Sequence, residues 1–293
     1  MPEGHTTHAL AGRLNNAFGG SPVGVSSPQG KFSDGAALLD GLTLLEASAW
    51  GKHLFAEFEG ERWLNVHLGL IGAFPVLPRL VSSTDLEVPV RGQVRLRLLN
   101  AAWVGDLRAP TICAVVTGEK VDQIQARLGP DPLRADEGGD QGALALRRIS
   151  RSERPIAELL MDQSVLAGVG NVYRCEVLFR HRVDPFRPGR EIRPSTWQAI
   201  WEDLVALMPL GMAFGQVLTM QDQVDQALAE VADGSAAAHT AMVTGAGPGD
   251  HFERLFYLYR RTGQPCRVCG SRVRTRLLAG RNLFWCGRCQ RRR

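Results

Sequence analysis

The pattern of apolar and polar positions predicts a helix near the N-terminus, strands after it, and helices in the second half of the chain. Residues 5–18 carry apolar side chains at helical spacing. Residues 19–30, "GGSPVGVSSPQG", are rich in turn-forming residues and predict a loop or a short strand. From residue 42 to residue 107 the pattern becomes that of strands.

Two hairpins are expected within this strand region. Residues 54–58, "LFAEF", and residues 63–74, "WLNVHLGLIGAF", flank the turn-like "EGER" and should pair with each other. Residues 93–100, "QVRLRLLN", alternate cleanly between polar and apolar side chains, and residues 101–107 are the expected returning strand.

The second half of the chain has helical periodicity. Four helices are expected, at residues 121–128, 155–162, 168–183 and 195–208. The third should begin with glycines and be amphipathic, and core packing explains the apolar face of the fourth. The polar segment 134–142, "RADEGGDQG", predicts a domain boundary. Residues 232–250 are small and are expected to form a mobile loop.

Length and composition are those of a globular protein with about two domains. The chain has 293 residues, of which 44% are hydrophobic and 22% are charged, so it can bury a sizeable core. No stretch reaches the ~18 apolar residues that a membrane helix needs, and the N-terminus lacks the pattern of a secretory signal. We therefore expect a cytosolic protein without a membrane partner, and a monomer.

Positive charge is concentrated near the C-terminus. The net charge is only +4, yet residues 257–293 contain eleven arginines and no acidic residue. Guanidinium groups bind phosphates in bidentate geometry, so a nucleic-acid partner is one hypothesis. An arginine-rich composition with a solvated tail is the alternative.

Four of the six cysteines form two Cys-x-x-Cys pairs separated by sixteen residues: Cys266, Cys269, Cys286 and Cys289. Two such pairs supply the four thiolates of a tetrahedral zinc site, and the segment between them is long enough for a β-hairpin. Two disulfides are the alternative, which a cytosolic location disfavours. Because four protein ligands close the coordination sphere, the zinc should be structural. Cys113 and Cys175 stand in apolar surroundings and are expected to be core residues.

The first residues of the chain, Met1-Pro2-Glu3, suggest a nucleophile. Removal of Met1 would leave Pro2 with a free secondary amine, which can attack the anomeric carbon of a sugar and form a covalent iminium. A terminal amine has a reference pKa near ~8, and the positive end of a helix starting after Gly4 would lower it further. Glu3 would be the adjacent proton donor and acceptor. The alternative is that both residues merely begin a helix.

Several separated motifs, in order, resemble the formamidopyrimidine-DNA glycosylase and endonuclease VIII family of bifunctional DNA repair enzymes. They are the N-terminal "PEG", "GKHLF", "HLGLIGAF", "LGPDPL", "LLMDQSVLAGVGNVYRCEVLF", and the cysteine pairs with "GRNLFWCGRCQ". The resemblance covers nearly the whole chain, and "PEG" in place of "PEL" is more similar to the endonuclease VIII branch.

The resemblance implies an α+β multi-domain fold. An N-terminal catalytic β-sandwich domain with flanking helices would occupy residues 1–135. A helical DNA-binding domain with a helix-two-turn-helix would occupy residues 143–260. A β-hairpin zinc finger holding one structural Zn²⁺ would occupy residues 261–293.

The resemblance also implies roles for single residues. Pro2 matches the nucleophile, Glu3 the general acid/base, and Lys52 a strand lysine that holds the phosphate beside the lesion. Asn171, after two glycines, and Arg281, at the tip of the zinc finger, match DNA-phosphate contacts. An ordinary exposed lysine is the alternative for Lys52.

Three residues of "HLGLIGAF" match the segment that enters the DNA. Leu70, with Ile71 beside it, falls where the family inserts an apolar wedge into the vacated base stack, although a plain apolar strand explains the same letters. His67 would contact a phosphate. The alternative is a histidine in a strand whose ring makes its hydrogen bonds within the protein. His5 and Thr6 depart from the family pattern, which leaves the substrate range open.

The function implied is a DNA glycosylase with AP lyase activity. It would remove oxidised pyrimidines from damaged or abasic-site DNA through a Schiff base on Pro2, followed by β- and δ-elimination, in the bacterial cytosol at the nucleoid. An oxidised-purine glycosylase is the nearest alternative. A non-catalytic zinc-finger protein that binds damaged DNA is the alternative from another class.

Overall fold

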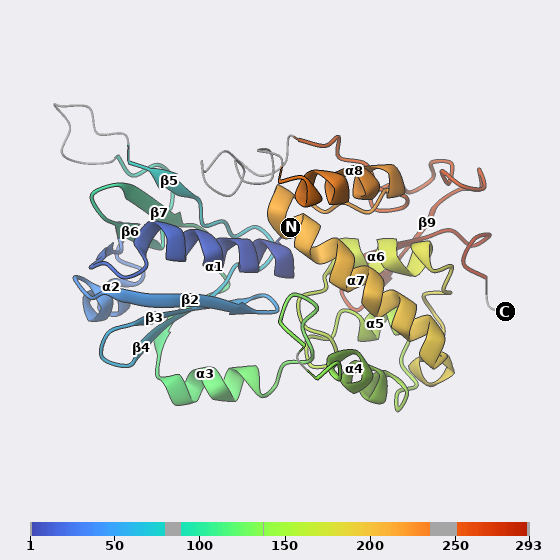
Figure 1. Ribbon diagram of the computed structural model, residues 1–293, viewed down its shortest axis with the longest axis horizontal. Coiled ribbons are helices and arrows are strands. Elements are labelled where there is room, and N and C mark those ends of the chain that lie inside the picture. Colours follow the sequence, from blue (N-terminus) through green and yellow to red (C-terminus); the bar gives the residue numbers. More distant parts are fainter. Residues whose placement is uncertain (1, 80–88, 137, 235–250, 292–293) are drawn as a thin grey trace. The chain divides into compact units, whose positions relative to one another are not determined.

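The computed structural model describes residues 2–79, 89–136, 138–234 and 251–291 (Figure 1). Within these ranges the chain forms two compact units, which meet in the sequence between Arg127 and Leu128. None of the helices in the described ranges is long and apolar enough to cross a membrane.

The first unit consists of two four-stranded antiparallel sheets and three helices. One sheet has the order β1-β6-β7-β5 and the other the order β2-β3-β4-β8. The strands are β1 (Gly24–Ser26), β2 (Leu44–Trp50), β3 (His53–Phe58), β4 (Arg62–His67), β5 (Val76–Pro78), β6 (Leu96–Leu99), β7 (Trp103–Leu107) and β8 (Ile112–Val116). The helices are α1 (Gly4–Phe18), α2 (Ser33–Leu39) and α3 (Gly118–Gln125). Apolar side chains from both sheets and from α1 share one core, as expected for a β-sandwich with flanking helices.

Helix α1 is anchored to the second sheet by one side chain. The Asn15 amide donates to the carbonyl of Ala47 at 2.8 Å and accepts from the Ala47 N–H at 2.6 Å. This pair satisfies backbone groups of β2 that a sheet neighbour would otherwise bond. Leu10, Leu14 and Phe18 of the predicted apolar face are buried, which confirms the first predicted helix.

Both predicted hairpins are present, but the second strand of the first one is shorter than expected. β3 pairs with β4, and β6 pairs with β7. The prediction that residues 63–74 form one strand is wrong beyond His67, because the chain turns there. Gly69 has a φ of +69°, and a Cβ on Gly72 would lie 2.1 Å from the Leu68 carbonyl oxygen, so neither glycine fits a continuous strand with side chains.

The second unit is helical and carries a two-stranded hairpin. Its elements are α4 (Gln141–Ile149), α5 (Ile156–Leu159), α6 (Asn171–Arg180), η1 (Gly189–Glu191), α7 (Pro194–Phe214), α8 (Gln221–Ala232), β9 (Arg274–Leu278) and β10 (Arg281–Trp285). The apolar face predicted for residues 195–208 is buried within α7, as expected. Most of the loop predicted at residues 232–250 lies outside the described residues.

Helix α6 is not amphipathic, contrary to the prediction. Every residue from Asn171 to Phe179 is buried, including Arg174 and Glu176. The polar side chains of α6 can be buried because they form hydrogen bonds with backbone and side-chain groups elsewhere in the same unit. The helix is therefore the centre of its unit, with neighbours on all sides.

Candidate functional site

The N-terminal residues lie at the start of α1. Glu3 is the N-cap residue, and its carbonyl accepts from the N–H groups of Thr6 (3.0 Å) and Thr7 (3.4 Å). Glu3 is completely buried and Pro2 is half-buried. The positive end of the helix dipole is therefore adjacent to Pro2 and Glu3, as the sequence predicts. Their catalytic roles stay predictions at this point.

His5 is held in its neutral form. It is buried, its Nε2 lies 3.2 Å from the Thr6 hydroxyl, and burial lowers its pKa to about 3, with the charges of the N-terminal amine and His8 acting in the same direction. The two residues that depart from the family pattern thus contact each other beside Glu3. Among the described residues, His5 is not part of any cluster that could hold a metal ion.

Lys52 lies in a turn and not in a strand, contrary to the expectation. Trp50 pairs with His53, so Gly51 and Lys52 form the two-residue turn between β2 and β3. Gly51 has a φ of +58°, which suits the first position of such a turn. Lys52 directly precedes His53, which pairs with His67 across β3 and β4, and the positive charge of Lys52 contributes to the lowered pKa of His67. The expected phosphate contact of Lys52 stays a prediction.

The turn after β4 exposes the two residues expected to form the wedge. Leu70 is 47% exposed and Ile71 is 82% exposed, although both are large and apolar. His67 is the last residue of β4, opposite His53, and their rings meet edge to face at 5.0 Å. The structure thus places Lys52, His67 and the Leu70–Ile71 pair at the same end of one sheet.

Asn171 begins α6 directly after the two glycines, at position N1 behind the N-cap Gly170. Its amide nitrogen donates to the backbone carbonyl of Asn282 at 3.0 Å, and its oxygen accepts from Arg174. Asn282 follows Arg281 in β10, so this amide links the start of α6 to the tip of the hairpin. Only 5% of Asn171 is exposed, and its predicted phosphate contact is untested.

The hairpin tip presents Arg281 on a tight turn. Leu278 pairs with Arg281, and the two residues between them, Ala279 and Gly280, have φ values of 48° and 72°. Positive φ at both central positions defines a type I′ turn, which matches the twist of the strands. The half-buried Arg281 is thereby held at the end of a rigid hairpin.

Two side chains whose roles the sequence did not reveal organise this unit. Gln163 accepts from the Gly168 N–H at 3.0 Å and donates to the Val169 carbonyl at 3.1 Å, which fixes the glycine turn before α6.

The buried Glu176 accepts from the N–H groups of the three residues from Tyr257 to Tyr259 and from the Thr219 hydroxyl, at 2.8 to 2.9 Å. Burial raises the pKa of Glu176, while these four donors favour its carboxylate form. Glu176 therefore ties α6 to the segment that leads into the hairpin.

Replacing Glu176 by glutamine is expected to destabilise the protein by about 2–4 kcal/mol, because an amide NH₂ would face donors and leave buried N–H groups without an acceptor. Urea unfolding followed by circular dichroism measures the change. The matched control is Glu202→Gln on the exposed face of α7, which should stay within about 0.5 kcal/mol of wild type. Equal midpoints for the two variants would contradict the role assigned to Glu176.

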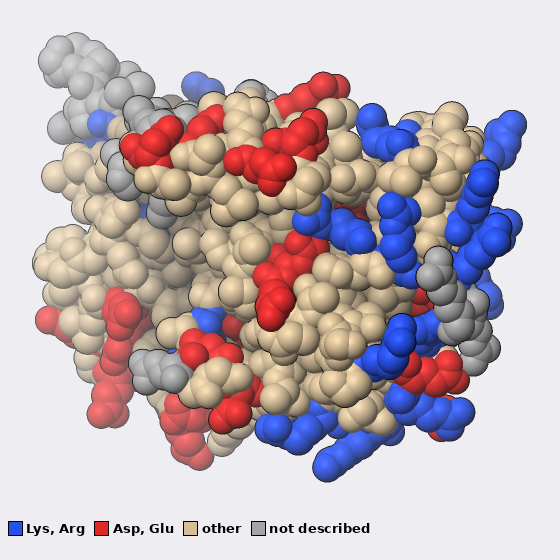
Figure 2. Space-filling view, turned by 45° about the vertical axis from the view of Figure 1, so that its right-hand side comes forward, with Lys and Arg blue, Asp and Glu red and all other residues tan. Residues whose placement is uncertain are grey.

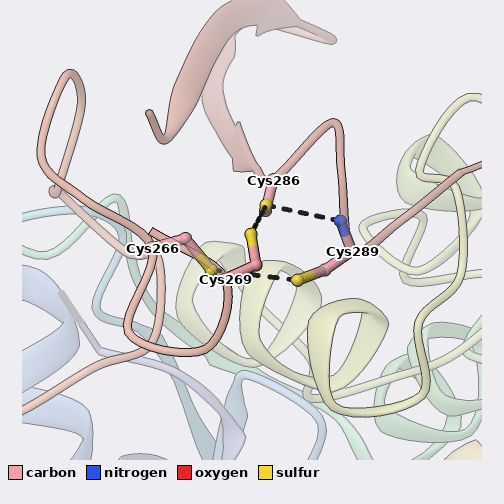
Figure 3. A group of neighbouring side chains, drawn as sticks. All are labelled: Cys266, Cys269, Cys286 and Cys289. Atoms are coloured by element: carbon pink, nitrogen blue, oxygen red, sulfur yellow. Dashed lines mark hydrogen bonds between the residues drawn. The ribbon is translucent and has the colours of Figure 1, made fainter. Parts of the chain in front are cut away.

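The four predicted metal ligands converge in the second unit (Figure 3). The Sγ atoms of Cys266, Cys269, Cys286 and Cys289 all lie within 4.8 Å of one another. The Sγ atoms of Cys269 and Cys286 are 3.4 Å apart, and those of Cys266 and Cys289 are 3.9 Å apart. These separations exclude the alternative of two disulfides, whose bonds are about 2.05 Å long.

The donor set and its geometry fit one structural zinc ion. Four thiolates at Zn–S distances of about 2.3 Å span tetrahedral edges of about 3.8 Å, close to the separations found here. The site is anchored to the helices by Gln290, which accepts from the Cys286 N–H at 2.9 Å and donates to the Val183 carbonyl at 3.0 Å. Cys113 and Cys175 lie outside the cluster, and burial raises the pKa of each thiol to about 12. Cys175 is a buried core residue, as expected, whereas Cys113 is only partly buried against the core of the first unit.

Part of the surface of the second unit is basic. Figure 2 shows Lys and Arg gathered on the right-hand side of the view, over this unit. Arg274 and Arg276 are exposed on β9, and the Arg276 guanidinium lies over the Phe186 ring, 5.7 Å from its centroid. Such a surface favours a polyanionic partner.

Three family models match the chain in sequence order. They are the formamidopyrimidine-DNA glycosylase N-terminal domain over residues 1–113, the formamidopyrimidine-DNA glycosylase H2TH domain over residues 128–222, and the zinc finger found in FPG and IleRS over residues 263–292. Endonuclease 8 1 of Mycobacterium tuberculosis is 47% identical over 291 residues, covering 99% of this chain and 100% of the relative. Formamidopyrimidine-DNA glycosylase of Methylococcus capsulatus is 30% identical, covering 86% and 84%.

Solved structures have the same fold. The Lactococcus lactis Fpg protein in complex with DNA containing N7-benzyl-Fapy-dG has a TM-score of 0.76 at 19% identity, covering 99% of this chain and 100% of that one. The MutM (Fpg) protein of Thermus thermophilus has a TM-score of 0.69 at 27% identity, covering 99% and 98%.

The two-sheet unit, the helical unit and the zinc hairpin are thus those of a DNA repair glycosylase. The chain belongs to the formamidopyrimidine-DNA glycosylase and endonuclease VIII family. Members of this family are DNA glycosylases with lyase activity at abasic sites, and the chain is an enzyme of this class.

Proposed function

We propose that this enzyme removes oxidised pyrimidines from DNA and then cleaves the strand through a Schiff base on Pro2. The observation that carries the proposal is the position of Glu3, which is completely buried and is the N-cap residue of α1, directly after Pro2. A carboxyl group at that position can exchange protons with a sugar attacked by the neighbouring amine. The choice of pyrimidines is supported by the 47% identity to a relative named endonuclease 8, against 30% to a formamidopyrimidine-DNA glycosylase.

The reaction begins with the Pro2 nitrogen. Its lone pair attacks C1′, the bond from C1′ to the base breaks, and the departing base takes up the proton that the Pro2 nitrogen loses. Glu3 protonates the ring oxygen as the C1′–O4′ bond opens, which gives an iminium between Pro2 and C1′.

Strand cleavage follows from the iminium. Loss of a proton from C2′ expels the 3′-phosphate, and a second elimination expels the 5′-phosphate. Hydrolysis of the imine then frees Pro2 and leaves a gap of one nucleotide. The zinc ion, when bound, holds the hairpin in shape and takes no part in these steps.

The groups that hold the DNA in this proposal are Lys52, His67, Asn171 and Arg281 on phosphates, and Leu70 with Ile71 in the vacated stack. Support comes from the exposure of the two apolar residues and from the rigid hairpin that carries Arg281. The partner is therefore DNA with damaged bases or abasic sites, bound by one copy of the chain. We place the activity in the bacterial cytosol, at the nucleoid.

A panel of duplexes with defined lesions tests the proposal. Single-turnover excision should be at least about tenfold faster for 5-hydroxyuracil or thymine glycol than for 8-oxoguanine, and borohydride should trap a covalent protein–DNA adduct on abasic DNA. Faster excision of 8-oxoguanine would replace the pyrimidine assignment by the oxidised-purine alternative. Tight DNA binding without any adduct would contradict the Schiff-base mechanism.

A further inference from the structure

Thr111 contacts the last residue of β4 through both its backbone and its side chain. Its N–H donates to the His67 carbonyl at 2.9 Å, and its hydroxyl donates to the same carbonyl at 3.0 Å. The hydroxyl oxygen is also 2.9 Å from Nδ1 of the His67 ring. Thr111 immediately precedes β8, whose residue Ile112 pairs with His67. The Thr111 N–H thus fixes the backbone of His67, and its hydroxyl lies within hydrogen-bond distance of the His67 ring.

The His67 ring in turn holds the turn that follows it. The Gly69 N–H donates to His67 Nδ1 at 3.0 Å. Gly69 has a φ of +69°, and a Cβ built on it would lie 2.4 Å from the Thr111 methyl carbon. The Thr111 side chain therefore fills the space above Gly69, and the two residues fit together only because one of them is glycine.

These contacts favour one of the two neutral forms of the His67 ring. A backbone N–H cannot rotate, so its donation to Nδ1 requires Nδ1 to be an acceptor. The Thr111 hydroxyl has one hydrogen, which it can give either to the His67 carbonyl or to Nδ1, where it would share the lone pair with the Gly69 N–H. The neutral ring must then carry its hydrogen on Nε2. Burial, helped by the charges of His53 and Lys52, lowers the pKa of His67 to about 4, so the neutral ring is the form present at physiological pH.

We propose that Thr111 is a positioning residue that fixes the turn of residues 69–71 through the His67 ring, and so holds Leu70 and Ile71 ready to replace an extruded base. The inference rests on the proposed function, because it gives the exposed pair its role as the wedge. A turn that is ordered before DNA binds does not lose conformational freedom when the base leaves the stack. Thr111 touches neither the lesion nor the reacting atoms in this scheme.

The test compares Thr111→Val with Thr111→Ser. Valine keeps the methyl group that packs on Gly69 and removes the hydroxyl, whereas serine keeps the hydroxyl. Excision of an oxidised pyrimidine is measured in single turnover, and base extrusion is followed by the fluorescence of 2-aminopurine opposite the lesion. Thr111→Val should slow excision and lower the extruded fraction by about 3- to 10-fold, as for the loss of one hydrogen bond. Thr111→Ser should stay within about twofold of wild type.

A second substrate separates positioning from general damage to the protein. At a preformed abasic site no base has to leave the stack. Thr111→Val should therefore reduce the rate of cleavage at such a site clearly less than it reduces the rate of base excision. Equal losses on both substrates, or no loss on either, would overturn the inference. A wild-type enzyme that neither excises nor cleaves would instead contradict the proposed function.

Two substitutions of His67 test whether its ring acts on the Gly69 turn or directly on the DNA. Asparagine places its carbonyl oxygen near the position of Nδ1, while glutamine places its amide near the position of Nε2. If the ring acts through Gly69, His67→Asn should retain more base extrusion than His67→Gln. The reverse order would mean that His67 acts mainly as a donor to DNA, and the positioning role would fail.

Discussion

Blocking the N-terminal amine with a short peptide extension is expected to reduce covalent trapping on abasic DNA by about 10³-fold or more. The extension turns the amine of Pro2 into an amide, whose nitrogen has no lone pair available to attack C1′. Affinity for the same DNA should change by less than about threefold, because phosphate contacts supply most of the binding. Borohydride trapping and fluorescence anisotropy measure the two quantities. Pro2→Gly, which keeps an amine but loses the secondary amine of proline, should lose most of the trapping as well.

The matched control carries the same extension at the C-terminus, where it leaves Pro2 free, and should trap DNA as wild type does. Proteolytic removal of the N-terminal extension should restore trapping. An N-terminally extended protein that still forms the adduct would show that another amine is the nucleophile. Lys52, on its turn between β2 and β3, would be the first residue to examine.

Cys286→Ser is expected to disrupt the zinc site and, with it, the hairpin that carries Arg281. Structural zinc contributes about 10–16 kcal/mol to the folding of isolated zinc-finger peptides at pH 7, so losing one of four thiolates is expected to cost several kcal/mol. The dissociation constant for abasic DNA should rise at least about tenfold. Metal analysis of the purified protein should show less than one zinc ion per chain.

Cys113→Ser is the matched control, since Cys113 lies in the first unit and outside the four-cysteine cluster. It should retain one zinc ion and the wild-type affinity for DNA. A Cys286→Ser protein with full zinc content would contradict the assigned ligand set. Full DNA affinity despite zinc loss would separate the hairpin from DNA binding.

Local sequence patterns correctly predicted those helices and hairpins whose formation depends on residues close together in the chain. The helix at the N-terminus, the β3–β4 and β6–β7 hairpins and the apolar face of α7 all follow from spacing within a few residues. The cysteine spacing likewise predicted the metal cluster, because each Cys-x-x-Cys pair can place two thiolates on one turn. The family resemblance supplied the candidates Lys52, Asn171 and Arg281, none of which stands out by its own spacing.

The structure differs from the sequence-based predictions where contacts between residues far apart in the chain decide the conformation. The sequence predicts an amphipathic helix at residues 168–183, yet Arg174 and Glu176 of α6 are both buried. Their partners include backbone groups up to 83 residues away in the chain, and periodicity carries no information about such contacts. The family resemblance implied that Lys52 lies in a strand, but Gly51, with its positive φ, and Lys52 form the turn between β2 and β3.

The sequence by itself therefore determined the nucleophile candidate at Pro2, the zinc ligands, the first helix and the two hairpins of the first unit, because these depend on residue type and on short spacing. Only the tertiary structure decided that Glu176 ties α6 to the hairpin and that Asn171 reaches β10. It alone placed Thr111, 44 residues from His67 in the chain, on the ring that holds the Leu70–Ile71 turn. The physical reason is that hydrogen bonds and burial depend on distance in space, which a chain sets only once its strands and helices have packed.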